Sequence, residues 1–245
     1  LGTDERLVIL WAVFQCLYCE SEGRDHVKLV NCNRQLSIEL KNREAFFLIM
    51  ESERALRELV NELFLSVRED TEDWILSEGE EIEKKSSRME IIFSPWMVDL
   101  NNKKIQKGLL KRILKLLQQG VEMDRAQSIL EELRVLLDHL NDELAFGFEY
   151  ELEDVSEILK ECGICFPEEG DLLARLNQYI KICSELLNIR LFVFIGMRNY
   201  FTGDEISMLA MEAGYLGCSI LCIENMCSGA EKDMILIDKD LCRVV

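Results

Sequence analysis

The acidic residues between positions 138 and 171 form a long stretch of potential metal ligands in this 245-residue sequence, with Lys160 as its only base. Glu149 and Glu151 share one face if the chain is extended there, and Asp154 and Glu157 share one face if it is helical. Oxygens that converge where one form changes to the other could hold a metal ion. Alternatively, Glu153 and Asp154 simply favour the N-terminus of a helix through its dipole.

A run of lysines after residue 102 is the clearest basic feature, in a chain whose 46 Asp and Glu outnumber its 28 Lys and Arg. The net charge is −18, yet no acid interrupts this run. At 100° per residue the lysines fall on one narrow stripe of a helix, opposite its leucines. Such a stripe could contact phosphates, or it could be an ordinary solvated helix face. Its members are Lys104, Lys107, Lys111 and Lys115, flanked by Lys103 and Arg112.

Composition disfavours several other chemistries. His26 and His139 are the only histidines, which nearly excludes a His-based nucleophile or metal triad. Neither Gly-x4-Gly-Lys-[Ser/Thr] nor Gly-x-Gly-x-x-Gly occurs, so no motif is present to cradle a nucleotide phosphate. The strongly negative net charge excludes a generally basic nucleic-acid coat.

The 10 cysteines include two CxxC pairs, Cys16/Cys19 and Cys162/Cys165, which together could supply four thiolates to zinc. No histidine lies beside either pair. Most of the cysteines lie in apolar runs, where a thiol behaves as a small hydrophobe, and a chain of this length does not need disulfide staples. We therefore expect reduced, cytoplasmic thiols.

The hydrophobic pattern predicts an α/β fold with a mostly parallel sheet. Fully apolar strands in the C-terminal half are typical of strands buried on both faces. Ser52 is placed to cap a helix, and Thr202 with Glu205 forms a capping box at the start of another. A further helix is expected over 172–187. The expected strands cover residues 35–40, 45–50, 74–76, 89–93, 190–195, 218–223 and 234–237.

Two leucine-rich helices interrupt this α/β pattern. The first carries the lysine stripe and ends at Gly120, and the second begins near Asp124. Two such helices joined by a short loop predict an antiparallel helical hairpin. We therefore expect a helical leg over 101–145 inserted into an α/β head formed by 27–100 and 146–245. On the second helix the inward positions would be Ile129, Leu130, Leu133, Leu136, Leu137 and Leu140.

Residues 7–18 form a nearly continuous apolar run that is too short to span a bilayer, so we expect no membrane segment. The run could be a weak signal segment, although it lacks a convincing small-residue cleavage site. The chain begins at Leu1, and a new pattern opens at Val27. We interpret residues 1–26 as an extension outside the native domain, with Val27 as the native first residue.

Six short motifs follow one another along the chain: Leu48-Ile-Met-Glu51, Trp74-Ile-Leu-Ser77, Asp99-Leu-Asn-Asn-Lys-Lys104, Arg190-Leu-Phe-Val-Phe194, Leu221-Cys-Ile-Glu-Asn225 and Ile235-Leu-Ile-Asp-Lys-Asp-Leu-Cys242. Their order and spacing resemble the Csn-two family, the small adaptation protein of type II-A CRISPR–Cas systems. The resemblance runs from about Val27 to the C-terminus, and residues 1–26 have no counterpart.

This resemblance implies a P-loop-like head without a Walker motif, and a helical leg. It also implies a non-enzymatic homotetramer, a ring that encloses the ends of double-stranded DNA during spacer acquisition, with the integrase and effector nuclease of adaptation as partners. Relatives hold structural Ca²⁺ in the segment after the leg, which corresponds here to 148–154 and Glu157. Glu149, Glu151 and Glu157 match best, Asp154 completes the set, and Gly147 stands where some relatives have an acid.

Two other classes of function stay open. The acidic cluster with a divalent ion could belong to a nuclease or a degenerate NTPase-like enzyme, or the chain could be a protein-interaction scaffold of the adaptation complex. For a DNA clamp, sequence-independent phosphate contact is expected. The contacts could come from Lys103, Lys104, Lys107, Lys111 and Lys115 of the leg, or from Lys84, Lys85 and Arg88 of the head.

Overall fold

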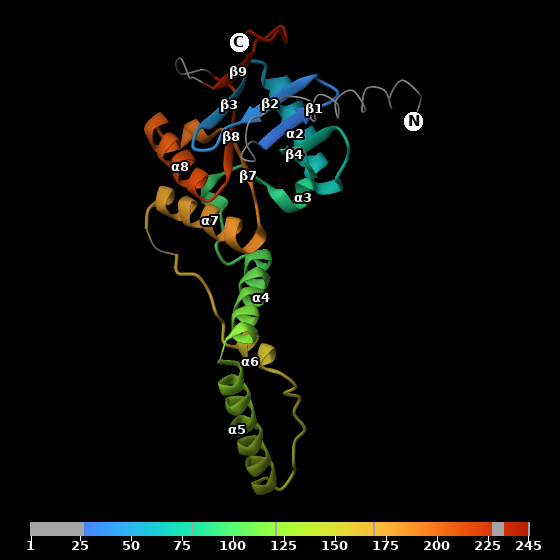
Figure 1. Ribbon diagram of the computed structural model, residues 1–245, viewed down its shortest axis with the longest axis vertical. Helices are drawn as coiled ribbons and strands as arrows, with labels where there is room; N and C mark the ends of the chain where they lie inside the picture. Colours follow the sequence, from blue (N-terminus) through green and yellow to red (C-terminus); the bar gives the residue numbers. More distant parts are fainter. Residues whose placement is uncertain (1–26, 80, 121, 169, 227–232, 245) are drawn as a thin grey trace, which may run out of the picture. The chain divides into compact units, whose positions relative to one another are not determined.

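The computed structural model describes residues 27–79, 81–120, 122–168, 170–226 and 233–244. The chain divides into two compact units (Figure 1). Within these described ranges, the first unit comprises the residues up to 99 and from 170 on, and the second unit comprises those from 100 to 168. The predicted N-terminal extension, residues 1–26, lies outside the described residues.

A five-stranded parallel sheet forms the centre of the first unit. Its strand order is β6-β7-β8-β3-β9, and all neighbouring pairs are parallel. The two strands β7 and β8 are almost completely buried, as their continuous apolar sequences predict. The expected α/β class with a parallel sheet is therefore confirmed. The strands are β3 (Ala45–Met50), β6 (Met89–Ile92), β7 (Leu191–Ile195), β8 (Ser219–Glu224) and β9 (Met234–Ile237).

A second, antiparallel sheet was not predicted as a separate layer. Its order is β2-β1-β4-β5, and β1 pairs with both β2 and β4. The strands expected near 35–40 and 74–76 exist, but they belong to this sheet. Strand periodicity does not encode the partner of a strand, which packing decides. The members are β1 (Val27–Asn31), β2 (Leu36–Leu40), β4 (Trp74–Glu78) and β5 (Glu81–Glu83).

One apolar core joins the two sheets and helix α2 (Glu53–Glu69). Leu29 of the antiparallel sheet, Leu48 of the parallel sheet and Leu59 of α2 are fully buried in this core. The predicted cap of α2 is confirmed, since the Ser52 side chain accepts a hydrogen bond from the backbone N–H of Ala55. The apolar stripe of α2 thus fixes the helix against both sheets.

The remaining long helices of the first unit are α7 (Leu172–Leu187) and α8 (Gly203–Tyr215), which pack on each other. The predicted capping box opens α8: the Thr202 hydroxyl accepts from the backbone N–H of Glu205, and the Glu205 carboxylate accepts from the backbone N–H of Thr202. The hydrogen bonds that the Glu205 carboxylate accepts from the backbone N–H and the hydroxyl of Thr202 lower the pKa of Glu205. Short turns complete the unit: α3 (Lys85–Arg88), η1 (Pro95–Met97) and η2 (Met197–Asn199).

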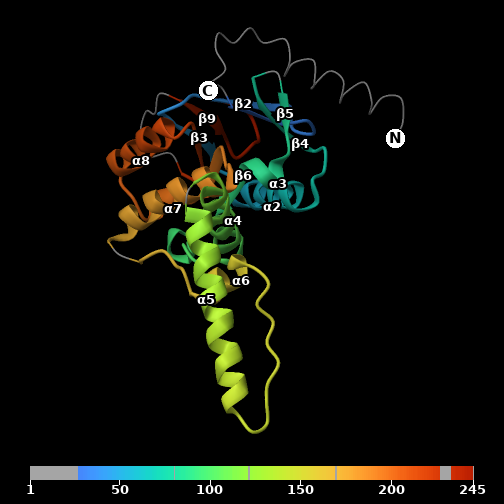
Figure 2. The same cartoon turned by 60° about the horizontal axis from the view of Figure 1, so that its bottom comes forward.

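The second unit contains α4 (Lys103–Gln119), α5 (Glu122–Glu143) and α6 (Val155–Glu161). We expected α4 and α5 to form an antiparallel hairpin, but they follow one another end to end (Figures 1 and 2). The chain returns along α5 through residues 144–154, which have no regular secondary structure, and α6 then packs on α4. This return path places residues 146–168 in the second unit, whereas the sequence pattern assigned them to the head.

The return segment takes the place of α4 as the partner of α5. Arg134 donates hydrogen bonds to the carbonyl oxygens of Leu152 (2.7 Å) and Glu153 (2.9 Å). The Tyr150 hydroxyl donates to the Asp138 carboxylate (2.7 Å), which raises the pKa of Tyr150. An irregular segment covers less of the surface of α5 than a packed helix would. Only one of the six expected inward positions, Leu130, is therefore buried. Ile129, Leu136 and Leu140 are exposed, and Leu133 and Leu137 are half-buried.

None of the helices in the described residues has both the length and the apolar character needed to cross a membrane.

Gly214 and Gly203 lie in the same helix, α8, but only Gly214 is closely packed against another segment. A Cβ on Gly214 would lie 2.5 Å from the backbone nitrogen and 2.8 Å from the Cα of Arg43. The guanidinium of Arg43 stacks on the ring of Tyr215, 4.5 Å from its centroid. The loop that carries Arg43 is therefore in direct contact with the helix. A Cβ on Gly203 would meet nothing within 4 Å.

We expect Gly214→Ala to lower the free energy of unfolding by about 2 kcal/mol, because inserting a methyl group into a filled contact costs roughly 1–3 kcal/mol. Gly203→Ala is the matched control and should leave stability unchanged or raise it by about 0.5 kcal/mol. Urea unfolding of both variants measures the difference. Equal stabilities would show that the contact between α8 and the Arg43 loop is not as close as described.

Candidate nucleic-acid interface

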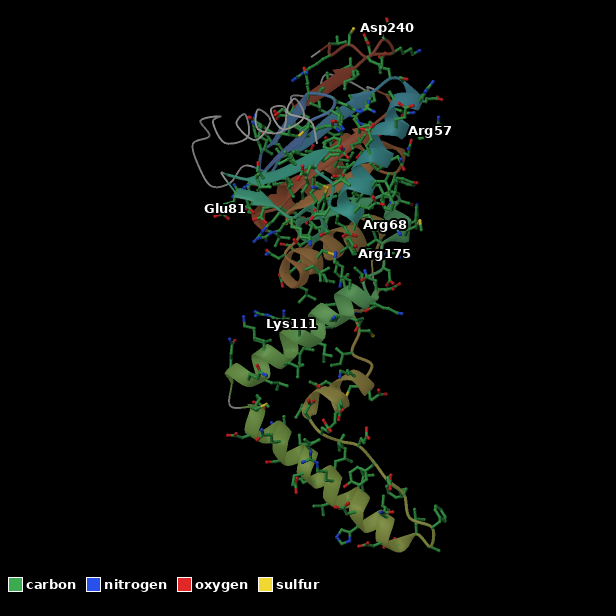
Figure 3. All side chains as sticks on the ribbon, turned by 90° about the vertical axis from the view of Figure 1, so that its right-hand side faces the viewer. Arg57, Arg68, Glu81, Lys111, Arg175 and Asp240 are labelled. Carbon is green, nitrogen blue, oxygen red and sulfur yellow. The ribbon has the colours of Figure 1, made fainter. Side chains whose placement is uncertain are left out.

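The lysine stripe lies on α4, whose N-terminus is capped by Asn102. The Asn102 side-chain oxygen accepts hydrogen bonds from the backbone N–H groups of Lys104 and Ile105, both at 3.0 Å. Ile105 is buried, which fixes the rotation of the helix and turns the opposite side to solvent. Figure 3 shows Lys111 on the side of α4 that is turned away from α6. The exposed basic residues are Lys103, Lys104, Lys107, Lys111, Arg112 and Lys115.

Charge is strongly segregated within the second unit. α4 carries six basic residues and no acid, while residues 122–168 carry 14 acids and 3 bases. Among the described residues, Lys107, Lys111 and Lys115 form no ion pair. From residue 103 to residue 115 the helix rises about 18 Å, which matches roughly five steps along a DNA strand. Lys107, Lys111 and Lys115 are therefore well placed for phosphate contact.

One further base lies next to the stripe and was not among the predicted residues. Lys160 of α6 and Lys107 of α4 both line a groove of about 260 Å³ between these two helices. Its apolar lining includes Leu110, Ile113 and Leu159. The sequence did single out Lys160 as the only base in the acidic stretch. Only the packing of α6 against α4 brings it beside the stripe.

The alternative cations in the head are engaged with other groups. Lys85 is buried and its ammonium donates to the carbonyl oxygen of Thr71 (2.9 Å), with Asp70 at 3.6 Å. Lys84 lies 3.9 Å from the same Asp70 carboxylate. These interactions fix the segment between β5 and β6, so the head cations are less available for phosphates than the α4 lysines.

Arg88 is also paired. Its guanidinium forms a bidentate ion pair with Glu83, at 2.9 and 3.3 Å, and donates to the carbonyl oxygen of Asn188 (3.4 Å). Bidentate pairs of this kind hold a guanidinium in one orientation. Lys85 and Arg88 are thus held by protein groups, while Lys84 is exposed, and DNA contact by these three residues stays an alternative prediction.

Two of the four predicted metal ligands cap helix α6. The Asp154 carboxylate accepts from the backbone N–H of Ser156 (2.6 Å), and the Glu157 carboxylate accepts from the backbone N–H of Glu153 (2.7 Å). The hydrogen bonds from Ser156 lower the pKa of Asp154. The simpler interpretation of these acids, as residues that favour a helix N-terminus, therefore accounts for their positions.

The other two predicted ligands, Glu149 and Glu151, are exposed in the return segment. In the described part of the chain, no three His, Cys, Asp or Glu side chains come close enough to hold a metal ion together. The four carboxylates therefore do not converge on one point in the described residues, and the calcium site stays a prediction. Gly147 has φ of 58°, a conformation that an acidic side chain would adopt only under strain.

The cysteines that the structure describes are all free thiols. Cys183, Cys218 and Cys222 are buried, and burial raises the pKa values of Cys218 and Cys222. This agrees with the expectation of thiols that behave as small hydrophobes. Cys162 and Cys165 differ, because both are exposed at the end of α6. The pair Cys16/Cys19 lies outside the described residues.

Capping and calcium binding by Asp154 make different predictions. Asp154→Asn keeps an oxygen that can cap the helix, whereas Asp154→Ala removes it. Hydrogen exchange over residues 154–162 should be unchanged in Asp154→Asn and faster in Asp154→Ala. Calcium or a chelator should alter neither variant nor the wild type. A stabilisation by calcium that Asp154→Asn abolishes would support the metal assignment.

The cap formed by Asp154 should also depend on pH. Because the pKa of Asp154 is lowered in the folded state, its stabilising effect should be lost as the pH falls through that lowered pKa.

Among solved structures, the chain resembles a putative ABC transporter ATP-binding protein from Pyrococcus furiosus. The two share 9% sequence identity, with a TM-score of 0.37, and the alignment covers 87% of this chain and 96% of that one. No curated protein sequence matches the chain.

A family model described as CRISPR-associated protein (Cas_Csn2) matches residues 67–241. The match begins within α2 and extends through all of the second unit and both C-terminal strands of the parallel sheet, β8 and β9. It covers more than half of the sequence, including the lysine-rich α4 and the acidic return segment. The chain therefore belongs to the CRISPR-associated Cas_Csn2 family.

Proposed function

We propose that this protein is a non-enzymatic clamp that binds the ends of double-stranded DNA without sequence preference and acts in CRISPR spacer acquisition. The observation that supports it best is the exposed basic side of α4, where six basic residues follow one another over about 18 Å of a helix that contains no acid. Membership of a CRISPR-associated family supports the proposal that such a surface acts in CRISPR adaptation.

The net charge of −18 does not oppose this role, because binding depends on the local field rather than on the mean charge. Most acids of the second unit lie on α5 and in the return segment, and Glu157 and Glu161 lie on α6, which packs on the side of α4 away from Lys111. In the proposed homotetramer, four copies of the basic surface would line one hole and add their fields. Such contacts bind phosphates and are strongly dependent on salt.

A non-enzymatic role is supported by the carboxyl ends of the parallel strands, where α/β proteins commonly bind ligands. Glu224 stands there, at the end of β8, buried and accepting a hydrogen bond from the backbone N–H of Arg198 (3.1 Å). Burial raises its pKa. A buried carboxyl group at this position does not help to bind a phosphate, and the sequence lacks the glycine-rich motif that would.

The proposed partners are DNA ends, further copies of the chain, and the integrase and effector nuclease of the adaptation machinery. An enzyme of the nuclease or NTPase class and a scaffold with incidental DNA affinity are the rival functions. The basic side of α4 favours the clamp over both, because neither rival requires an uninterrupted row of cations.

Replacing Lys107 and Lys111 together with Glu should weaken duplex binding by roughly tenfold to a hundredfold near 0.1 M salt, because two phosphate contacts are lost. The loss should be equal for duplexes of unrelated sequence. The slope of log affinity against log salt should fall by about two. Fluorescence anisotropy over a salt series measures all three quantities.

The matched control is Lys181→Glu with Lys239→Glu, which makes the same charge change at exposed positions of the first unit. It should leave affinity nearly unchanged, and both double variants should keep the wild-type helicity and mass. If the two double variants lose equal affinity, net charge rather than the α4 stripe determines binding, and the proposed interface is wrong.

Linear and circular duplexes distinguish the clamp from its rivals. With equal masses of each DNA, Mg²⁺ and ATP, we expect binding to linear DNA only, because a ring must be threaded from an end. Native gel shifts and product analysis record binding, strand cleavage and phosphate release together. Equal binding to circular DNA would favour the scaffold, and cleavage or phosphate release would favour an enzyme.

A further inference from the structure

Helix α2 presents an exposed apolar stripe with an arginine at each end. Phe64 is 39% exposed and packs edge-on against Phe93, itself 47% exposed, with 5.8 Å between ring centroids. Arg57 and Arg68 are separated by 11 residues, three turns of helix, so they project from the same side as Phe64. Figure 3 labels both along α2. In the part of the chain that the structure describes, neither arginine forms an ion pair. We call Arg57, Phe64, Leu65, Arg68 and Phe93 the α2 face.

Helix α5 presents a second exposed apolar stripe, this one accompanied by acids. Ile129 and Leu136 are each 54% exposed, and Leu140 is 44% exposed. Their spacing of 7 and 11 residues places them on one side of the helix. Glu132 and Glu143 lie at the edge of the same stripe and are also separated by 11 residues. We call these five residues the α5 face.

The return segment does not use the α5 face. Its hydrogen bonds go to Arg134 and Asp138, and Asn141 accepts from the backbone N–H of Phe148 (2.6 Å). At 100° per residue these three positions lie more than a quarter turn away from Leu136. The α5 face is therefore left open by the partner that α5 has within its own unit.

The two faces are complementary in charge and in register. Eleven residues of helix rise about 16.5 Å, so the spacing of the two arginines equals the spacing of the two glutamates. In an antiparallel pair, Arg57 would lie opposite Glu143 and Arg68 opposite Glu132. Phe64 is seven residues from Arg57, and Leu136 is seven residues from Glu143, so these two apolar side chains would also meet. Antiparallel alignment additionally opposes the two helix dipoles favourably.

We propose that the α2 face of one copy docks on the α5 face of a second copy of this chain. The inference deepens the proposed function, on whose homotetramer it rests, by naming a contact between copies. Chains with a charge of −18 repel one another on average, so association requires local complementarity of this kind. Each chain carries one face of each type. Two copies can therefore form the contact twice, each with one α2 face and one α5 face, or a ring can form it once between each pair of neighbouring copies.

A charge swap tests the contact, with mass measured by sedimentation velocity in the absence of DNA. Arg57→Glu with Arg68→Glu should weaken self-association by about tenfold or more, because two opposed pairs become repulsive. Adding Glu132→Arg with Glu143→Arg to the same chain should restore the wild-type mass. The matched control adds Glu131→Arg with Asp142→Arg, which have the same spacing of 11 residues on the opposite side of α5 and should not restore it.

Several outcomes would overturn the proposal. If the α2 variant keeps the wild-type mass, or the control restores it as well, this contact does not form. A wild-type chain that is monomeric at every concentration would leave the α2 face to a different acidic partner. A monomer whose stability alone responds to the swap would place the contact within one chain. Duplex affinity measured on the same variants is a separate result, because the α4 lysines are unchanged in all of them.

Discussion

Burial of the parallel strands on both faces is the constraint on which the first unit depends. Side chains alternate along β7, so Leu191 and Val193 enter the core shared with the antiparallel sheet and α2, while Phe192 and Phe194 project from the opposite face and are also fully buried. Both faces must therefore be covered. Helix α8 packs on β3 and β8, and its fit requires glycine at position 214. The antiparallel sheet and these helices follow from one need to remove two apolar surfaces from water.

Segregation of charge gives the protein its most distinctive surface. In the first unit, Lys85 and Arg88 have acidic partners within 4 Å, so their fields are largely cancelled. α4 contains no acid with which its lysines could pair at the usual helical spacing. Its field is therefore uncompensated locally, although the chain as a whole is acidic. The basic surface of α4 is suited to a ligand with dense negative charge. The negative net charge of the whole chain repels other acidic proteins.

The acidic return segment illustrates how one residue type can serve either of two purposes. Asp154 accepts from the Ser156 N–H, which the first turn of α6 leaves without a helical partner, and Glu157 accepts from the Glu153 N–H just before the helix. A carboxylate that accepts such hydrogen bonds is already stabilised in its charged form, as the lowered pKa of Asp154 records. Helix capping therefore explains the position of Asp154 without a cation, while the calcium assignment stays a prediction.

The sequence by itself determined the features that depend on local chemistry: the strand periodicities, the caps at Ser52 and Thr202, the break at Gly120 and the lysine stripe of α4. It also indicated the family, because motif order is a property of the chain. Only the tertiary structure decided which strands share a sheet, that α5 continues from the end of α4 while α6 folds back onto α4, and that the carboxylates stay apart. Periodicity shows which side of a helix must be covered but not what covers it. For α4 and α5 the return segment competed with the hairpin for the same apolar surfaces, and that competition depends on contacts between residues far apart in the chain.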